Sequence, residues 1–253
     1  MAAVTFAIGR AEHRSLLRSS LLALAGAALA LLALACFMTV RWQFRAADWP
    51  KSGLLFLLGA LQMLRALPAH HPFDTLGQAN GVTLGRGVLV CLLAGLIGER
   101  APAVAAVATA LALLVLAMDG VDGRLARRDG TVSDFGARFD METDAVFVAV
   151  LAVLTWQLGK AGPWILLSGA MRYLFMALAL AVPLLRRPVP SSRRGKTIAV
   201  IQMLALILAI APFCPAAVAT ALTAVALALL TASFLLDVRW QWQDGRRTVG
   251  AQP

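Results

Sequence analysis

The chain has 253 residues, of which 60% are hydrophobic and only 14% charged, and its formal net charge is +10. This composition excludes an ordinary soluble domain, which needs more polar surface, and indicates a protein whose solvent is the lipid bilayer. The basic residues lie between apolar runs, so they favour topology signals and contacts with anionic head groups or phosphates. We therefore expect membrane lipid, and no nucleic acid, as a partner.

Apolar runs close to the length of a membrane span follow one another along the whole chain. In chain order they lie near residues 17–40, 53–68, 82–98, 101–118, 141–159, 163–185, 197–212 and 215–236. The second run is short and is followed by Pro68, His70, His71 and Pro72. It fits either a spanning helix or an interfacial or re-entrant piece. The runs predict an all-α polytopic membrane protein, in which two hydrophobic helices precede a six-helix core that begins near Asn80.

Histidine and cysteine are not arranged as metal ligands in this chain. His70 and His71 are adjacent and precede a proline, so they lack ligand spacing and favour an interfacial turn. Cys36, Cys91 and Cys214 lie in or beside apolar runs, and we expect them to pack as small apolar side chains of helices.

Basic residues predict the orientation of the helices. Four clusters alternate with pairs of apolar runs: Arg10, Arg14 and Arg18; Arg124, Arg127, Arg128 and Arg138; Arg186, Arg187, Arg193, Arg194 and Lys196; Arg239, Arg246 and Arg247. With eight crossings all four fall on one side, which the positive-inside rule makes cytoplasmic. The segment from Arg41 to Lys51 is an exception, because it carries three basic residues on the predicted outer side.

A group of acidic and small residues interrupts the apolar pattern between the fourth and fifth runs. Residues Asp119, Asp122, Gly123, Ala126 and Arg127 are spaced as one face of a helix, and Gly136, Asp140 and Asp144 follow at four-residue intervals as one face of the next. If these faces meet, four carboxylates converge at the membrane edge.

Four carboxylates in a small volume repel one another and need cations. Because the ligands are all oxygen, Mg²⁺ or Mn²⁺ fits better than zinc, and four aspartates balance the charge of two such ions. A diphosphate would then bridge the two metals. Gly123, Ala126 and Gly136 leave room for a nucleotide beside the backbone, and Arg127 has the fork geometry that binds phosphate.

The pattern Asp119-x-x-Asp122-Gly123-x-x-Ala126-Arg127, eight residues, then Gly136-x-x-x-Asp140-x-x-x-Asp144 is similar to the signature of the CDP-alcohol phosphotransferase (CDP-alcohol phosphatidyltransferase) family. Upstream, Asn80-x-x-Thr83-x-x-Arg86 resembles the start of that family's first core helix, with Ala79 where many members carry proline. The resemblance covers roughly residues 79–237. Residues 1–78 form an N-terminal extension outside it, and 238–253 a cytoplasmic tail.

The resemblance implies a six-helix core, usually in a homodimer, with a polar cavity facing the cytoplasm. It implies two metals held by the four aspartates, with Asp144 as general base. It also implies contacts with the CDP moiety by motif residues, here Asn80, Thr83, Gly123, Ala126 and Arg127. A bacterial inner membrane is the expected location.

Two further features bear on the alcohol that accepts the phosphoryl group. Arg172 interrupts an apolar run, and an intramembrane arginine is a candidate ligand for a phosphate. The basic loop of Arg193, Arg194 and Lys196 is either a topology signal or an acceptor site. The stretch Gly195-Lys196-Thr197 with Gln202 also resembles phosphatidylglycerophosphate synthases, whose acceptor is glycerol 3-phosphate.

The sequence thus predicts a phosphatidyltransferase of phospholipid biosynthesis, with CDP-diacylglycerol or a similar CDP-alcohol as donor and a small polar alcohol as acceptor. Glycerol 3-phosphate is favoured as that alcohol. Other family members use serine, inositol phosphate, or a CDP-aminoalcohol with diacylglycerol, and these stay open. A transporter or channel would carry charges at mid-bilayer on several helices. A non-catalytic scaffold would not need the complete aspartate set.

Overall fold

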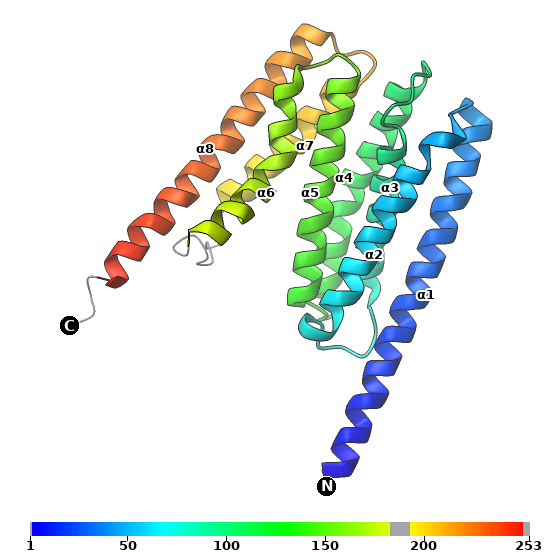
Figure 1. The fold of residues 1–253 in the computed structure, drawn as a ribbon, viewed down its shortest axis with the longest axis vertical. Coiled ribbons are helices and arrows are strands. Elements are labelled where there is room, and N and C mark those ends of the chain that lie inside the picture. Colours follow the sequence, from blue (N-terminus) through cyan, green and yellow to red (C-terminus); the bar gives the residue numbers. More distant parts are fainter. Residues whose placement is uncertain (1, 183–192, 250–253) are drawn as a thin grey trace. The chain divides into compact units, whose positions relative to one another are not determined.

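The structure is a computed structural model that describes residues 2–182 and 193–249, and the described residues form helices and no strand (Figure 1). Within those ranges some side chains are not described, namely those of residues 2–14, 68, 69, 122, 126, 179, 181, 193 and 243–249. The all-helical class predicted from the sequence is confirmed for the described part of the chain.

An α-helix lies over each of the eight predicted apolar runs. The helices are α1 (Ala2–Trp42), α2 (Pro50–His70), α3 (Gln78–Gly95), α4 (Val104–Arg128), α5 (Asp134–Gln157), α6 (Leu166–Ala181), α7 (Arg193–Ile210) and α8 (Ala216–Val249), with short 3₁₀ turns η1 (Ala46–Asp48) and η2 (Pro163–Ile165). The first and last helices extend well beyond their apolar runs. Their ends beyond those runs contain no proline, the residue that breaks a helix most strongly, so the helix continues past the point where the hydrophobicity stops.

Three helices of the described chain are long and apolar enough to cross a membrane: Ser15–Trp42, Val104–Leu125 and Ala216–Trp242. Pro163–Leu178 is apolar but shorter. Many large apolar side chains on these helices are exposed, such as Leu29 and Leu32 on α1 and Val225 on α8. This distribution fits an integral membrane protein, because lipid rather than water is the natural neighbour of such a surface.

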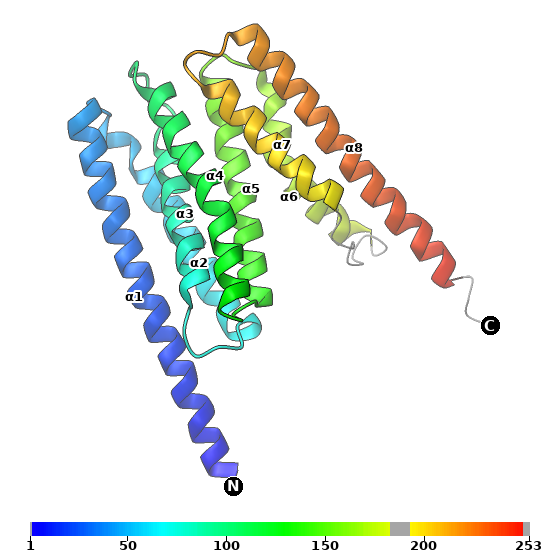
Figure 2. The same cartoon turned by 180° about the vertical axis from the view of Figure 1, so that it is seen from behind.

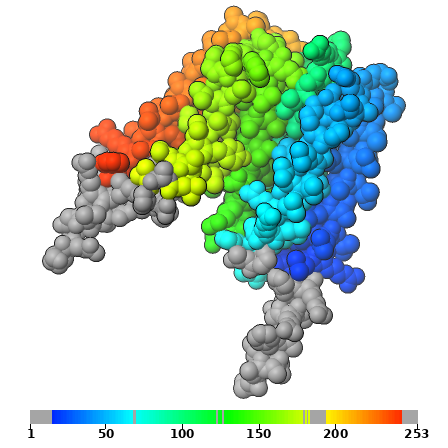
Figure 3. All heavy atoms as spheres, in the orientation of Figure 1, coloured from blue at the N-terminus to red at the C-terminus, as the bar shows by residue number. Residues whose placement is uncertain are grey.

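The chain divides into two compact units, Met1–Phe147 and Val148–Pro253. In the first unit α3 is central, since α1, α2 and α4 all pack against it (Figures 1 and 2). On the face drawn in Figure 3, α2 (cyan) lies beside α1 (blue). One apolar core joins α1, α2, α3 and the first turn of α5; its buried members are Leu16, Leu24, Met63, Leu67, Leu76, Leu84 and Phe135.

The connections at one end of the first unit are tied together by polar contacts. The buried Glu99 carboxylate, between α3 and α4, accepts backbone N–H groups of Arg45 (2.6 Å), Arg100 (2.7 Å) and Ala101 (3.1 Å). Nearby, α3 passes so close to the start of α2 that a Cβ on Gly95 would lie 2.5 Å from both the Trp49 ring and the Ser52 hydroxyl. This end of the unit therefore has a fixed geometry.

In the second unit α7 packs along α8, and α6 contacts α8 and η2 (Figure 2). A Cβ on Gly169 would lie 2.5 Å from the Ala149 backbone, so α6 and the last part of α5 cross at a glycine. Lys160, in the connection after α5, donates to the Cys214 carbonyl, and the Lys160 carbonyl accepts from the Thr220 hydroxyl at 2.8 Å.

Candidate active site

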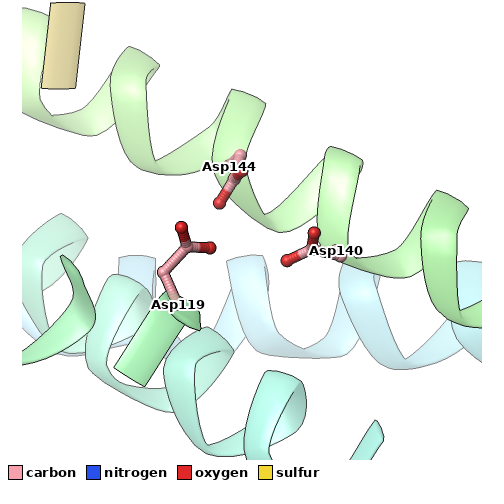
Figure 4. Close-up of side chains that lie close together, drawn as sticks. All are labelled: Asp119, Asp140 and Asp144. Carbon is pink, nitrogen blue, oxygen red and sulfur yellow. The ribbon is translucent and has the colours of Figure 1, made fainter. Parts of the chain in front are cut away.

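The candidate site lies where α4 and α5 face each other within the first unit. Asp119 projects from α4, and Asp140 and Asp144 project from α5 one helical turn apart (Figure 4). One carboxylate oxygen from each of the three lies within 4.8 Å of the others. The spacing argument predicted that these faces meet, and for these three aspartates they do. The side chains of Asp122 and Ala126 are outside the described residues.

A fourth charged side chain, that of Arg86 on α3, completes the cluster. Its Nη1 lies 2.5 Å from Asp140 Oδ1, its Nη2 lies 2.6 Å from Asp119 Oδ1, and Nη2 also pairs with Asp144. The Arg86 side chain is 1% exposed, whereas those of the aspartates are 28–42% exposed. The carboxylates therefore have a buried guanidinium on one side and an open side elsewhere.

The sequence pattern alone gives no role to Arg86, which is the last fixed position of the stretch that begins at Asn80. A signal was present, because Asn80, Thr83 and Arg86 follow at three-residue intervals, so they lie toward one side of a helix. An arginine that follows the candidate nucleotide ligands Asn80 and Thr83 by six and three residues, in an otherwise apolar stretch, needs a buried anionic partner. The acidic cluster supplies that partner.

Asn80 and Thr83 are both buried on α3, and their side chains bond to the preceding turn. Asn80 Nδ2 donates to the Leu76 carbonyl at 2.7 Å, and the Thr83 hydroxyl donates to the Ala79 carbonyl at 3.2 Å. Asn80 also packs against α5, since a Cβ on Gly136 would lie 2.9 Å from Asn80 Oδ1. Gly136 thus allows α5 to approach α3 one turn before Asp140.

Gly123 and Arg127 lie on α4 in the turns that follow Asp119. A Cβ on Gly123 would lie 3.4 Å from Arg127 Nη1, so the guanidinium folds back over the glycine. Arg127 is exposed and stands at the same end of α4 as the acidic cluster. The predicted motif residues with described side chains, Asn80, Thr83, Asp119, Gly123, Arg127, Gly136, Asp140 and Asp144, all belong to the first compact unit.

A family model for CDP-alcohol phosphatidyltransferases matches residues 76–233, which is more than half of the chain. The chain belongs to this family. No curated protein and no solved structure matches the chain. Membership supports transfer of a phosphatidyl group from a CDP-alcohol, and thus a transferase of phospholipid biosynthesis. The matched residues include the complete aspartate pattern and begin just before α3.

In this family member the donor set fits a hard divalent cation. Asp119, Asp140 and Asp144 offer only carboxylate oxygens, and no described histidine or cysteine joins them. Their three oxygens lie within 4.8 Å of one another, so small side-chain movements would bring them around one such ion. The Arg86 guanidinium already pairs with one oxygen of each carboxylate, which shows that the pocket stabilises positive charge.

The residues predicted to bind the acceptor belong to the second compact unit. Arg172 is half-buried on α6, and Lys196 is exposed on the first turn of α7. Arg194 pairs with Asp237 of α8 at 2.5 Å, a contact between partly exposed side chains 43 residues apart. The side chain of Arg193 lies outside the described residues.

Proposed function

We propose that the chain is a metal-dependent phosphatidyltransferase that moves a phosphatidyl group from CDP-diacylglycerol to a polar alcohol and releases CMP. The convergence of Asp119, Asp140 and Asp144 within the residues that match the family is the observation that supports this most directly. The open side of the cluster supports access by substrate, since each of the three carboxylates is 28–42% exposed.

In this proposal Asp119, Asp122, Asp140 and Asp144 hold two divalent cations, either Mg²⁺ or Mn²⁺. When bound, the cations withdraw charge from the diphosphate and stabilise the leaving CMP. Arg86 holds three of the carboxylates together from the buried side, and this limits their mutual repulsion in the absence of cations.

Asn80, Thr83, Gly123, Ala126 and Arg127 bind the CDP moiety in this proposal, and Gly136 leaves room beside it. Asn80 and Gly136 support this assignment by packing against each other next to the acidic cluster. Arg127 supports it as an exposed guanidinium on α4, because a planar fork binds a diphosphate through two parallel hydrogen bonds.

For the chemical step, Asp144 takes the proton from the acceptor hydroxyl as that oxygen attacks the β-phosphorus of the donor. The bond from the β-phosphorus to the bridging oxygen breaks, and its electron pair leaves with CMP. No fixed position of the aspartate motif is serine, cysteine or histidine, which supports a single in-line displacement without a covalent enzyme intermediate.

The acceptor in this proposal is an anionic alcohol such as glycerol 3-phosphate, drawn by Arg172, Arg193, Arg194 and Lys196. These residues supply positive charge, although Arg194 also neutralises Asp237. The site faces the cytoplasm of a bacterial inner membrane, and the chain forms a homodimer with six core helices and two N-terminal helices in the membrane.

The test is to incubate the purified protein with Mn²⁺ and CDP-diacylglycerol and a panel of alcohols: glycerol 3-phosphate, serine and inositol phosphate. A parallel reaction supplies a CDP-aminoalcohol and diacylglycerol. We expect CMP release and one phosphatidyl product, identified by mass spectrometry, with glycerol 3-phosphate as the preferred acceptor. No CMP release with any donor would refute the enzymatic proposal, and a different product would change only the acceptor or donor.

A further inference from the structure

Residues 71–77, the connection between α2 and α3, are held by two serines of α1. The Ser15 hydroxyl donates to the Asp74 carbonyl at 2.7 Å, and Ser19 Oγ accepts the Leu76 N–H at 3.2 Å. Ser19 also donates its proton to the Leu16 carbonyl at 2.9 Å, so its oxygen lone pairs are free to face Leu76. The backbone of this connection is thus held against α1 by two hydrogen bonds.

Leu76 links α1 to the candidate site, because its backbone bonds to both. Its N–H bonds to Ser19, and its carbonyl accepts from Asn80 Nδ2 at 2.7 Å. Asn80 in turn faces Gly136 with its Oδ1, because that oxygen would lie 2.9 Å from a Cβ at the glycine. The orientation of the Asn80 amide therefore depends on a backbone group that α1 holds in place.

His71 forms a second link, to the start of α5. Its Nε2 lies 2.8 Å from the Thr75 carbonyl, which only accepts, so Nε2 carries a proton. In the neutral ring Nδ1 is then an acceptor, and the Ser133 hydroxyl lies 3.4 Å from it. Ser133 Oγ also accepts the Gly136 N–H at 3.1 Å and thereby caps α5. The histidine is buried and lies in the connection that follows α2.

Apolar packing strengthens the same link. The His71 ring meets Phe135 edge-to-face at 5.2 Å and Phe73 at 5.5 Å. Phe135 is 1% exposed and shares its core with Leu16 of α1 and Met63 of α2. The first turn of α5, which leads to Asp140 and Asp144, is therefore packed on the N-terminal helices.

We propose that the N-terminal extension, residues 1–78, is a positioning element of the proposed nucleotide site. Ser19 acts on Asn80 through Leu76, and His71 acts on the start of α5 through Ser133; both are positioning residues rather than catalytic ones. The inference rests on the proposed function, because the effect is on binding of the CDP moiety.

The test compares neighbouring serines of α1 in the full-length protein. Ser19→Ala removes the acceptor of the Leu76 N–H, and Ser19→Thr keeps a hydroxyl. Ser20→Ala is the matched control, because Ser20 is fully buried and its hydroxyl has no hydrogen-bond partner among the described residues. His71→Phe keeps the ring contacts and removes both hydrogen bonds. Each variant is measured for CMP release and for the rise in melting temperature caused by CDP with Mn²⁺.

For Ser19→Ala we expect KM for the CDP donor to rise about fivefold, the size of one lost hydrogen bond, and for His71→Phe, which loses two, we expect at least the same rise. The rate at saturating donor should change much less, and the CDP-induced rise in melting temperature should shrink. Ser20→Ala should match the wild type, and Ser19→Thr should recover most of the affinity.

The inference is overturned if Ser19→Ala and Ser20→Ala have the same KM, or if activity falls only with the amount of folded protein. If Ser19→Ala does not fold, His71→Phe decides, and a wild-type KM in that variant overturns the inference. A wild-type protein that neither releases CMP nor responds to CDP instead refutes the proposed function.

Discussion

Arg86 Nη1 lies 2.5 Å from Asp140 Oδ1, and the same guanidinium pairs with Asp119 and Asp144, so a single side chain connects α3, α4 and α5. Three carboxylates so close together repel one another, and a buried cation with several donors offsets that repulsion. Arg86 is 1% exposed and cannot reach solvent without disrupting the helix contacts. The acidic cluster therefore includes a permanent positive charge from the protein itself.

Replacing Arg86 with glutamine should destabilise the protein, because the carboxylates lose their counter-charge. Breaking a fully buried pair costs about 3–5 kcal/mol, and we expect less here because the aspartates are 28–42% exposed. Thermal unfolding in detergent, followed by tryptophan fluorescence, measures the loss. Mn²⁺ should stabilise the variant more than the wild type, since the ion replaces the missing charge. An unchanged melting temperature without Mn²⁺ would contradict this account of the cluster.

Asp119→Asn and Asp144→Asn should each lower CMP release by at least about 100-fold, because each removes a charged cation ligand, and the second also removes the proposed base. Initial rates with CDP-diacylglycerol measure the effect. Asp129→Asn is the matched control: this aspartate is exposed in the turn after α4 and lies outside the cluster. Full activity in either cluster variant would rule out the proposed roles.

Gly136→Ala should weaken the contact between α3 and α5. The new Cβ would lie 2.9 Å from Asn80 Oδ1 and 3.3 Å from Ser133 Oγ, so Asn80 or the helix must shift. We expect a lower melting temperature and a raised KM for the CDP donor. Gly59→Ala on α2 is the control, because nothing lies within 4 Å of its Cβ position and alanine favours helix by about 0.5–1 kcal/mol. Equal behaviour of the two variants would show that the close approach is unimportant.

Glu99→Gln should lower the melting temperature near neutral pH. Burial by itself would raise the pKa of Glu99, but the backbone N–H groups of Arg45, Arg100 and Ala101 lower it below its ordinary value. A group with a lowered pKa stabilises the folded state above its unfolded-state pKa, about 4.3 for glutamate, and loses that contribution as pH falls through the folded-state value. The difference in melting temperature between wild type and variant should therefore be constant from pH 7 to about 5 and shrink below about pH 4. A difference in melting temperature that grows as the pH falls would contradict a lowered pKa of Glu99.

The spacing of the motif predicted much of the site. Asp140 and Asp144 are four residues apart in a continuous helix, so they had to share a face once α5 formed. The helices themselves followed from the apolar runs, because an α-helix overlaps each of the eight runs in the described part of the chain. Helical periodicity is a local property, and local properties are readable from neighbouring residues.

Contacts between residues of different helices could not be predicted in this way. Arg86 lies 54 residues from Asp140 and 58 from Asp144, and His71 lies 62 from Ser133. The sequence positions of Arg86 and His71 do not indicate which distant side chains they contact. The ends of α1 and α8 also differed from prediction, because hydrophobicity marks where lipid contact ends and not where helical hydrogen bonding ends.

The sequence by itself determined that the chain is helical and apolar, that two adjacent helices carry acidic faces, and that these faces suit divalent cations. Only the tertiary structure decided that a buried arginine completes the cluster and that the N-terminal helices share a core with the start of α5. The physical reason is that side-chain periodicity is set within a few residues, whereas charge compensation and core packing depend on which surfaces meet after the helices associate.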